Sequence, residues 1–153
     1  MGLEIERKFL VAGEFRSGTP KLYRQGYLSR VPERTVRVRV VDNLAWLTIK
    51  SLADDITRRE YEYEIPIGDA KELLEMCDGP LIEKYRWHIE YEGMTWEVDE
   101  FLGQNAGLIV AEIELEAADQ PFMLPPWAGK EVSSDDRYHN SRLSISPYSA
   151  WEK

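Results

Sequence analysis

The feature that most constrains this chain is a residue-by-residue alternation of apolar and charged side chains. In the first such segment, Leu3 and Ile5 alternate with Glu4 and Glu6. Successive side chains of a β-strand point to opposite faces, so a period of two predicts strands and not helices. We therefore expect a mainly β structure in which one face of most strands is charged.

The pattern recurs in eight segments, and the turns between them favour antiparallel pairing. Asp42 with Asn43, and Glu92 with Gly93, each separate two alternating runs, which is typical of tight hairpins. The expected strands are residues 3–11, 21–30, 35–41, 44–51, 57–67, 81–91, 94–101 and 108–117. One helix is expected over residues 69–77, with Asp69 as its N-cap, and a second, short helix within residues 132–143.

The length and the number of strands together limit the architecture. The chain has 153 residues, 43% of them hydrophobic, so residues 1–153 are expected to form one domain. Eight strands in an open sheet would leave two unpaired edges, and closing the sheet removes both. The expected fold is mainly β (α+β): a closed eight-stranded antiparallel β-barrel with a few peripheral helices. A two-sheet sandwich is the alternative.

Overall charge and segment composition exclude several kinds of partner. The formal net charge is -9, which argues against general binding to nucleic acid or to a membrane surface. A small polyanion remains compatible, because a few clustered Lys and Arg side chains outweigh the global charge locally. The N-terminal residues are too charged for a signal peptide, and no apolar run reaches transmembrane length. The single cysteine, Cys77, agrees with a reducing cytoplasm, which is the expected location.

Charges of one sign repeat along the polar faces of individual strands. One strand carries Arg37 and Arg39, whereas another carries Glu112 and Glu114. Taken alone, each strand is compatible with an ordinary solvated face. Side-by-side like charges repel, however, and the repulsion is relieved if they converge on metal ions and a charged ligand. Carboxylates bind hard cations such as Mg²⁺, and guanidinium and ammonium groups bind phosphate. The joint pattern therefore favours a metal–polyphosphate site.

The ordered series of charged motifs resembles that of the CYTH proteins, also called triphosphate tunnel metalloenzymes. Residues 4–8, Glu-Ile-Glu-Arg-Lys, are similar to the N-terminal ExExK signature of the family, and residues 112–114 to its final ExE pair. Between them, residues 36–39, 47–50, 58–62 and 84–86 and Asp99 are similar to its RxR, Lys-bearing, R-x-E-x-E, K-x-R and Asp elements. The resemblance runs from residue 3 to about residue 143.

This resemblance implies a barrel with a tunnel, in which triphosphates are hydrolysed or rearranged with Mg²⁺ or Mn²⁺. The sequence is most similar to a short bacterial branch that carries a QGYL segment, here residues 25–28, and a D-x-R-Y-x-N stretch, here residues 135–140. That branch is associated with hydrolysis of inorganic triphosphate (tripolyphosphate) to pyrophosphate and phosphate. The expected partner is thus a small-molecule polyphosphate, and a homodimer is compatible with the sequence.

The resemblance also implies roles for individual residues. Seven cations are expected to bind the phosphates: Lys8, Arg37, Arg39, Lys50, Arg58, Lys84 and Arg86. Seven carboxylates are expected to hold one or two divalent ions: Glu4, Glu6, Glu60, Glu62, Asp99, Glu112 and Glu114. A Lys–Tyr pair proposed to activate water matches Lys8 and Tyr27, and Lys8 as a simple phosphate ligand is the alternative. On the fifth strand, Arg58 favours the frame Glu60 and Glu62 over one that includes Glu64.

Three rival functions share parts of the pattern. Hydrolysis of nucleoside or thiamine triphosphate, or cyclic AMP synthesis, would use the same tunnel chemistry. A non-catalytic polyphosphate-binding module would need the cations, but not the carboxylates on several strands. A β-sandwich with a charged exterior would need neither an enclosed cavity nor a metal.

Overall fold

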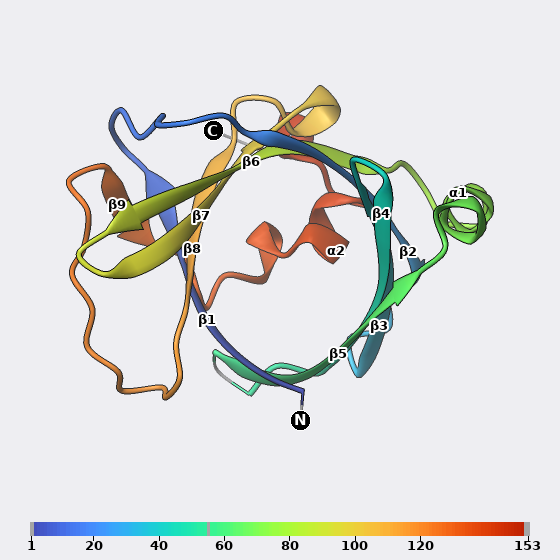
Figure 1. Ribbon diagram of the computed structural model, residues 1–153, viewed down its shortest axis with the longest axis horizontal. Helices are drawn as coiled ribbons and strands as arrows, with labels where there is room; N and C mark the ends of the chain where they lie inside the picture. The colour runs from blue at the N-terminus through green and yellow to red at the C-terminus, as the bar shows by residue number, and fades with distance from the viewer. Residues whose placement is uncertain (1, 55, 152–153) are drawn as a thin grey trace.

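The computed structural model describes residues 2–54 and 56–151, and eight antiparallel strands in it close into a barrel (Figure 1). The strands are β1 (Leu3–Val11), β2 (Lys21–Ser29), β3 (Arg34–Val41), β4 (Leu44–Ser51), β5 (Thr57–Ile65), β6 (Ile82–Tyr91), β7 (Met94–Phe101) and β8 (Ile109–Glu114). They follow the order β5-β4-β3-β2-β6-β7-β8-β1, and pairing of β1 with β5 completes the ring. The expected barrel is confirmed, and the sandwich alternative is wrong.

Strand β1 has three partners. Along one edge, Glu6 to Leu10 pair with β8. Along the other edge, Leu3 to Ile5 pair with β5, and Phe9 and Val11 then pair with a ninth strand, β9 (Ala128–Glu131). The alternation pattern did not predict β9, because this strand has four residues and its position depends on the exposed end of β1.

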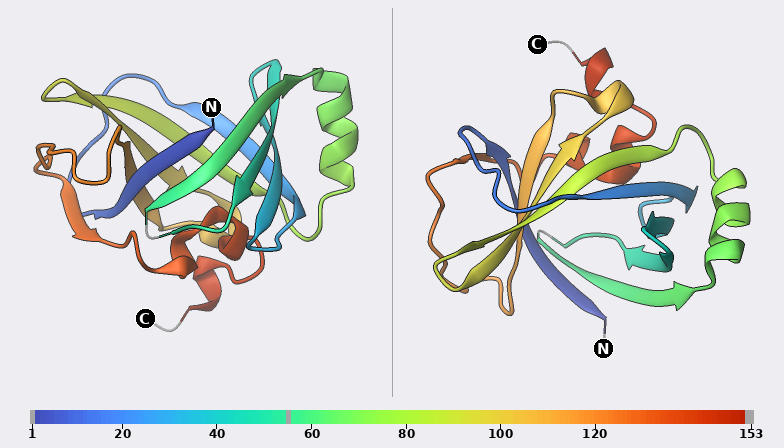
Figure 2. Two further views of the ribbon diagram at one scale, coloured as in Figure 1. Left: turned by 90° about the horizontal axis from the view of Figure 1, so that it is seen from below. Right: turned by 45° about the horizontal axis from the view of Figure 1, so that its top comes forward.

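Two apolar clusters cover the outside of the barrel wall. In the first, Phe9 of β1 and Trp127 each contact Trp96 of β7, edge to face, with ring centroids 5.6 Å apart. In the second, helix α1 (Ile67–Glu75) packs Ala70 and Leu74 against β3 and β4 (Figure 2). Because the main apolar contacts lie outside the wall, the inner face is left for polar side chains.

The C-terminal segment of residues 136–150, here called the closing segment, covers one end of the barrel (Figure 2, left). It contains short helices at Asp136–Tyr138 (η2), Asn140–Leu143 (α2) and Tyr148–Ala150 (η3). Tyr138 and Leu143 pack against Ile82, Phe101 and Val110. These three strand residues lie two positions from Lys84, Asp99 and Glu112, and so point to the same inner side. The interior is therefore apolar at its closed end and charged above it.

Several expected boundaries differ from the structure. Helix α1 begins at Ile67, with Pro66 at its N-cap and no side-chain cap, so Asp69 lies inside the first turn. Strand β8 ends at Glu114 and not at residue 117. The expected helix within residues 132–143 is two shorter helices, η2 and α2, broken at His139 with ψ of 136°. Among the described residues, no helix is long and apolar enough to cross a membrane.

Candidate active site

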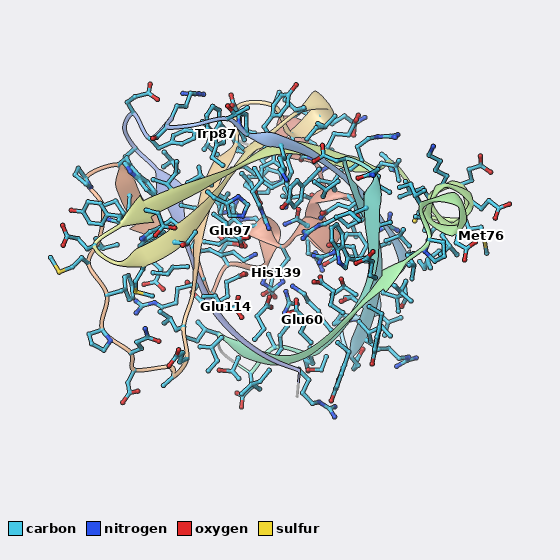
Figure 3. The ribbon with its side chains drawn as sticks, in the orientation of Figure 1. Glu60, Met76, Trp87, Glu97, Glu114 and His139 are labelled. Carbon is cyan, nitrogen blue, oxygen red and sulfur yellow. The ribbon has the colours of Figure 1, made fainter. Side chains whose placement is uncertain are left out.

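A cavity of about 160 Å³ lies inside the barrel, and charged side chains form most of its wall. It brings together fourteen of the fifteen predicted site residues: Glu4, Glu6, Lys8, Tyr27, Arg37, Arg39, Lys50, Arg58, Glu60, Glu62, Lys84, Arg86, Glu112 and Glu114. Figure 3 places Glu60, Glu97, Glu114 and His139 within the ring of strands, and Trp87 and Met76 outside it. Glu64 is exposed and does not line the cavity, which leaves Glu60 and Glu62 as the inward pair of β5.

Strand register explains why the charges meet. Glu6 lies opposite Glu114, and Lys8 opposite Glu112, where β1 pairs with β8. Arg86 lies opposite Asp99 where β6 pairs with β7. Since directly paired residues point to the same face of a sheet, each inward position adds to the same interior.

A first group of ion pairs joins β1, β4 and β5. The Glu4 carboxylate lies 3.1 Å from Lys50 Nζ and 3.2 Å from Arg58 Nε. Lys50 Nζ also lies 3.3 Å from Glu60 Oε2. Burial disfavours the charged form of Glu4, but Lys50 and Arg58 outweigh burial and lower its pKa to about 2. Glu4 is therefore ionised at neutral pH.

A second group gathers three carboxylates from three strands. Glu6 of β1, Glu97 of β7 and Glu112 of β8 each place an oxygen within 4.8 Å of the others. Burial, together with the charges of Glu112 and Glu4, raises the pKa of Glu6 to about 8. Carboxylates crowded in this way are stabilised by a hard divalent cation, which binds oxygen ligands. This cluster fits a divalent ion, and we name it the three-glutamate cluster.

Lys8 lies against the three-glutamate cluster. Its Nζ is 3.3 Å from Glu112 Oε1 and 3.6 Å from Glu6 Oε1. Burial disfavours the ammonium, but Glu112 and Glu6 outweigh burial and raise the pKa of Lys8 above its usual value. Lys8 therefore carries a positive charge here. Tyr27, the other member of the expected pair, is buried and also lines the cavity.

Asp99 lies behind the cavity wall. Arg86 donates to it through Nε at 2.7 Å and NH2 at 2.9 Å, and Lys84 Nζ lies 2.7 Å away. Only 1% of Asp99 is exposed. Burial disfavours its charge, but Arg86 and Lys84 outweigh burial and lower its pKa to about 2. Both cations also line the cavity, so Asp99 fixes their positions from behind.

Arg37 has a buried donor that no described residue accepts. Its NH2 donates to Thr48 Oγ1 at 3.2 Å, whereas its buried Nε has no hydrogen-bond partner. A buried N–H without an acceptor is costly, so a ligand oxygen would satisfy it. Beside it, burial and the charges of Arg37 and Arg86 lower the pKa of Arg39. This part of the wall is thus prepared for an anion.

Six further residues line the cavity that were not among the predicted site residues: Thr35, Thr48, Glu97, His139, Asn140 and Ser141. Glu97 shares the inner face of its strand with Asp99, so its spacing could have identified it. His139, Asn140 and Ser141 come from the closing segment, whose path no strand pattern predicts. Burial lowers the pKa of His139 to about 4, helped by the nearby charges of Lys8 and Arg58. Arg137 of the same segment is exposed and pairs with Asp135 outside the cavity, at 2.7 Å.

Comparison with known proteins agrees with this geometry. The CYTH domain matches residues 2–146. An inorganic triphosphatase from Acetivibrio thermocellus is 51% identical over 97% of both chains. One from Nitrosomonas europaea is 37% identical, covering 94% of this chain and 97% of its own. The crystal structure of the inorganic triphosphatase NE1496 matches with a TM-score of 0.68 and 35% identity, over 93% of this chain and 97% of that one.

Proposed function

This chain belongs to the CYTH domain family, and from that membership we propose that it hydrolyses inorganic triphosphate to pyrophosphate and phosphate. The observation that carries the proposal is the enclosed cavity, in which cations from β3, β4, β5 and β6 face the three-glutamate cluster. Phosphate binding needs the cations alone. The added carboxylates match a reaction assisted by a divalent metal.

We propose that the phosphates bind to Arg37, Arg39, Lys50, Arg58, Lys84 and Arg86, together with Lys8. The unsatisfied Nε of Arg37 supports this assignment most directly, because a phosphate oxygen supplies the acceptor it lacks. Arg86 and Lys84 share the carboxylate of Asp99, and Arg86 also pairs with Glu97 at 3.2 Å. Both cations also line the cavity, where they can donate to phosphate oxygens.

We propose that Glu6, Glu97 and Glu112 hold the metal, Mg²⁺ or Mn²⁺. Glu4, Glu60, Glu62 and Glu114 surround that cluster and are further candidate ligands. A divalent ion bound there would neutralise charge on phosphate oxygens and make a bound water more acidic. The chain itself supplies orientation, since the carboxylates come from paired strands of a closed barrel.

For Lys8 we propose binding in preference to proton transfer. Beside the free carboxylates of Glu112 and Glu6 its pKa is raised, which keeps it protonated near neutral pH, and a protonated amine cannot accept the proton of an attacking water. Charged Lys8 instead holds Glu6 and Glu112 and can donate to a phosphate oxygen. Tyr27 contributes a hydroxyl to the cavity wall, which can orient water or phosphate.

The lining favours an unsubstituted polyphosphate over a nucleotide. Tyr27 is the one Phe, Trp or Tyr side chain among the described residues that line the cavity. A nucleobase requires apolar or stacking contacts, which such a wall does not provide. Similarity to a putative adenylate cyclase from Bacillus halodurans, at 18% identity and a TM-score of 0.54, concerns the fold alone.

The test is phosphate release from tripolyphosphate, ATP, thiamine triphosphate and pyrophosphate in parallel, with Mg²⁺ and then with Mn²⁺. We expect tripolyphosphate to give the highest kcat/KM, and EDTA to abolish turnover until either metal is restored. The variant Arg37→Met tests the proposed phosphate contact of Arg37, and its KM for tripolyphosphate should be higher than that of the wild type. Faster turnover of ATP or thiamine triphosphate than of tripolyphosphate would overturn the proposed substrate, and EDTA-resistant turnover would overturn the metal.

A further inference from the structure

Two amide side chains link two cations at the closed end of the cavity. Asn140 Oδ1 accepts from Lys84 Nζ at 3.0 Å and from Gln25 Nε2 at 3.1 Å. Gln25 Oε1 in turn accepts from Arg39 Nε at 2.7 Å. The hydrogen bonds therefore run from Lys84 through Asn140 and Gln25 to Arg39, across β6, the closing segment, β2 and β3.

The chemistry of the end groups fixes the orientation of both amides. Arg39 can only donate hydrogen bonds, and so can Lys84 in its ammonium form, so each meets an amide oxygen. Gln25 therefore presents its oxygen to Arg39 and its nitrogen to Asn140, and Asn140 presents its oxygen to both neighbours. Reversing either amide would place two donors face to face. The arrangement has one stable orientation.

Packing, and not these side-chain bonds, holds Asn140 in place. On either side of it, Tyr138 and Leu143 are buried in the apolar cluster with Ile82 and Phe101. The Asn140 carbonyl also accepts from Ser144 N at 3.1 Å. Removing the Asn140 side chain should therefore leave the closing segment in place and remove only the hydrogen bonds that Asn140 accepts from Lys84 and Gln25.

A neutral amide is the side chain that suits this position. Arg37, Arg39, Lys84 and Arg86 line the cavity, and Asp99 is the one carboxylate among the described residues that pairs with Lys84. A carboxylate at position 140 would neutralise Lys84, whereas an apolar side chain would leave its ammonium to Asp99 alone. An amide accepts from the cation without cancelling its charge, and that charge stays available to an anion.

We propose that Asn140 is a positioning residue that holds Lys84 directly, and Arg39 through Gln25, in place for the phosphate group bound deepest in the cavity. The inference rests on the proposed function and assigns part of substrate affinity to the closing segment. Asn140 acts through Lys84 and Arg39, so its effect should fall on substrate binding more than on turnover.

The first experiment measures tripolyphosphate hydrolysis with Mg²⁺ by the wild type, Asn140→Ala, Asn140→Asp and Asn43→Ala. Asn43 is an exposed turn residue outside the cavity and is the matched control. Loss of a hydrogen bond to a charged group should raise KM about tenfold in Asn140→Ala, with a smaller change in kcat. Asn140→Asp should raise KM further, and the excess over Asn140→Ala should shrink at high salt.

The outcomes separate this inference from the proposed function. If the wild type releases no phosphate from tripolyphosphate, the proposed function fails. If the wild type is active and Asn140→Ala keeps its KM, the inference fails. A lowered melting temperature with unchanged KM would show that the residue is merely structural, and would also overturn the inference.

A double-mutant cycle tests the route through Lys84. If Asn140 acts by positioning Lys84, adding Asn140→Ala to Lys84→Met should change KM less than adding it to the wild type. An equal KM increase in both backgrounds would mean that Asn140 acts independently of Lys84, contrary to the proposal. If Lys84→Met does not fold, the same cycle with Arg39→Gln applies the same criterion at the other end of the chain of hydrogen bonds.

Discussion

Asp99 and Arg86 lie directly opposite each other on paired strands and form a two-point ion pair, with Nε to Oδ1 at 2.7 Å and NH2 to Oδ2 at 2.9 Å. Lys84 occupies the same carboxylate at 2.7 Å. The oxygens of Asp99 are thereby engaged by two cations, and the residue is absent from the cavity lining. We therefore propose that Asp99 orders cations and that metal binding belongs to the three-glutamate cluster.

Replacing Asp99 tests this division of roles. Asp99→Asn removes the negative charge between Arg86 and Lys84, and should destabilise the protein by about 3–5 kcal/mol because buried cations lose their partner. Urea denaturation measures the loss of stability, and calorimetric titration with Mn²⁺ measures the metal affinity, which should change little. A large loss of Mn²⁺ affinity at unchanged stability would instead assign Asp99 to the metal.

Glu112→Gln tests the metal cluster itself. The substitution removes one carboxylate from the three-glutamate cluster and a partner of Lys8 at 3.3 Å. Mn²⁺ affinity should fall at least about tenfold, and kcat should fall with it. Glu116→Gln is the matched control, because Glu116 is exposed and outside the cavity lining. Equal Mn²⁺ affinities of the two variants would contradict the assignment.

Leu115→Ala tests the outer apolar cluster. Leu115 is 5% exposed and packs in the cluster that contains Trp96 and Trp127. The change should lower the free energy of unfolding by about 2–5 kcal/mol, through lost burial and a residual cavity. Leu124→Ala, at a position 53% exposed, should cost about 0.5 kcal/mol or less. Urea midpoints compare the two, and similar values would argue against a packed exterior.

His139 should make the folded state sensitive to acid. Burial lowers its pKa from 6.5 to about 4, so the folded protein keeps it neutral where the unfolded chain takes up a proton. Stability should therefore fall as pH decreases from the unfolded value towards the folded one. The free energy of unfolding should fall less in His139→Gln than in the wild type when the pH is lowered from about 7 to about 5. Urea denaturation at each pH measures this difference. Equal losses in both proteins would show that His139 does not contribute.

Local pattern predicted the barrel wall well, because strand alternation depends only on neighbouring residues. The hairpin bounds at β3–β4 and β6–β7 follow from turn residues, and Asp42, Glu92 and Gly93 do adopt positive φ. The same alternation put on the charged strand faces thirteen of the side chains that the cavity brings together, and the family resemblance added Tyr27.

The features that the sequence did not predict depend on contacts between distant segments. Glu97 and Asp99 share one face of β7, but only Asp99 is held by both Lys84 and Arg86 of the neighbouring strand, and only Glu97 lines the cavity. β9 and the closing segment follow neither strand nor helix periodicity. Asn140 reaches the cavity because Tyr138 and Leu143 pack inside the barrel, and no local rule contains that information.

Strand β1 connects the wall of the cavity to the segment that closes its end. The strand carries Glu6 and Lys8 inward, while Lys8 O accepts from Val132 N at 2.8 Å and Lys8 N donates to Ser133 Oγ at 2.9 Å. The stretch that leads into the closing segment is thus bonded to the strand that bears the acids. These bonds tie the position of the closed end to that of the acids, and so to the depth of the cavity. The closed end of the cavity would then limit the length of the polyphosphate that can bind.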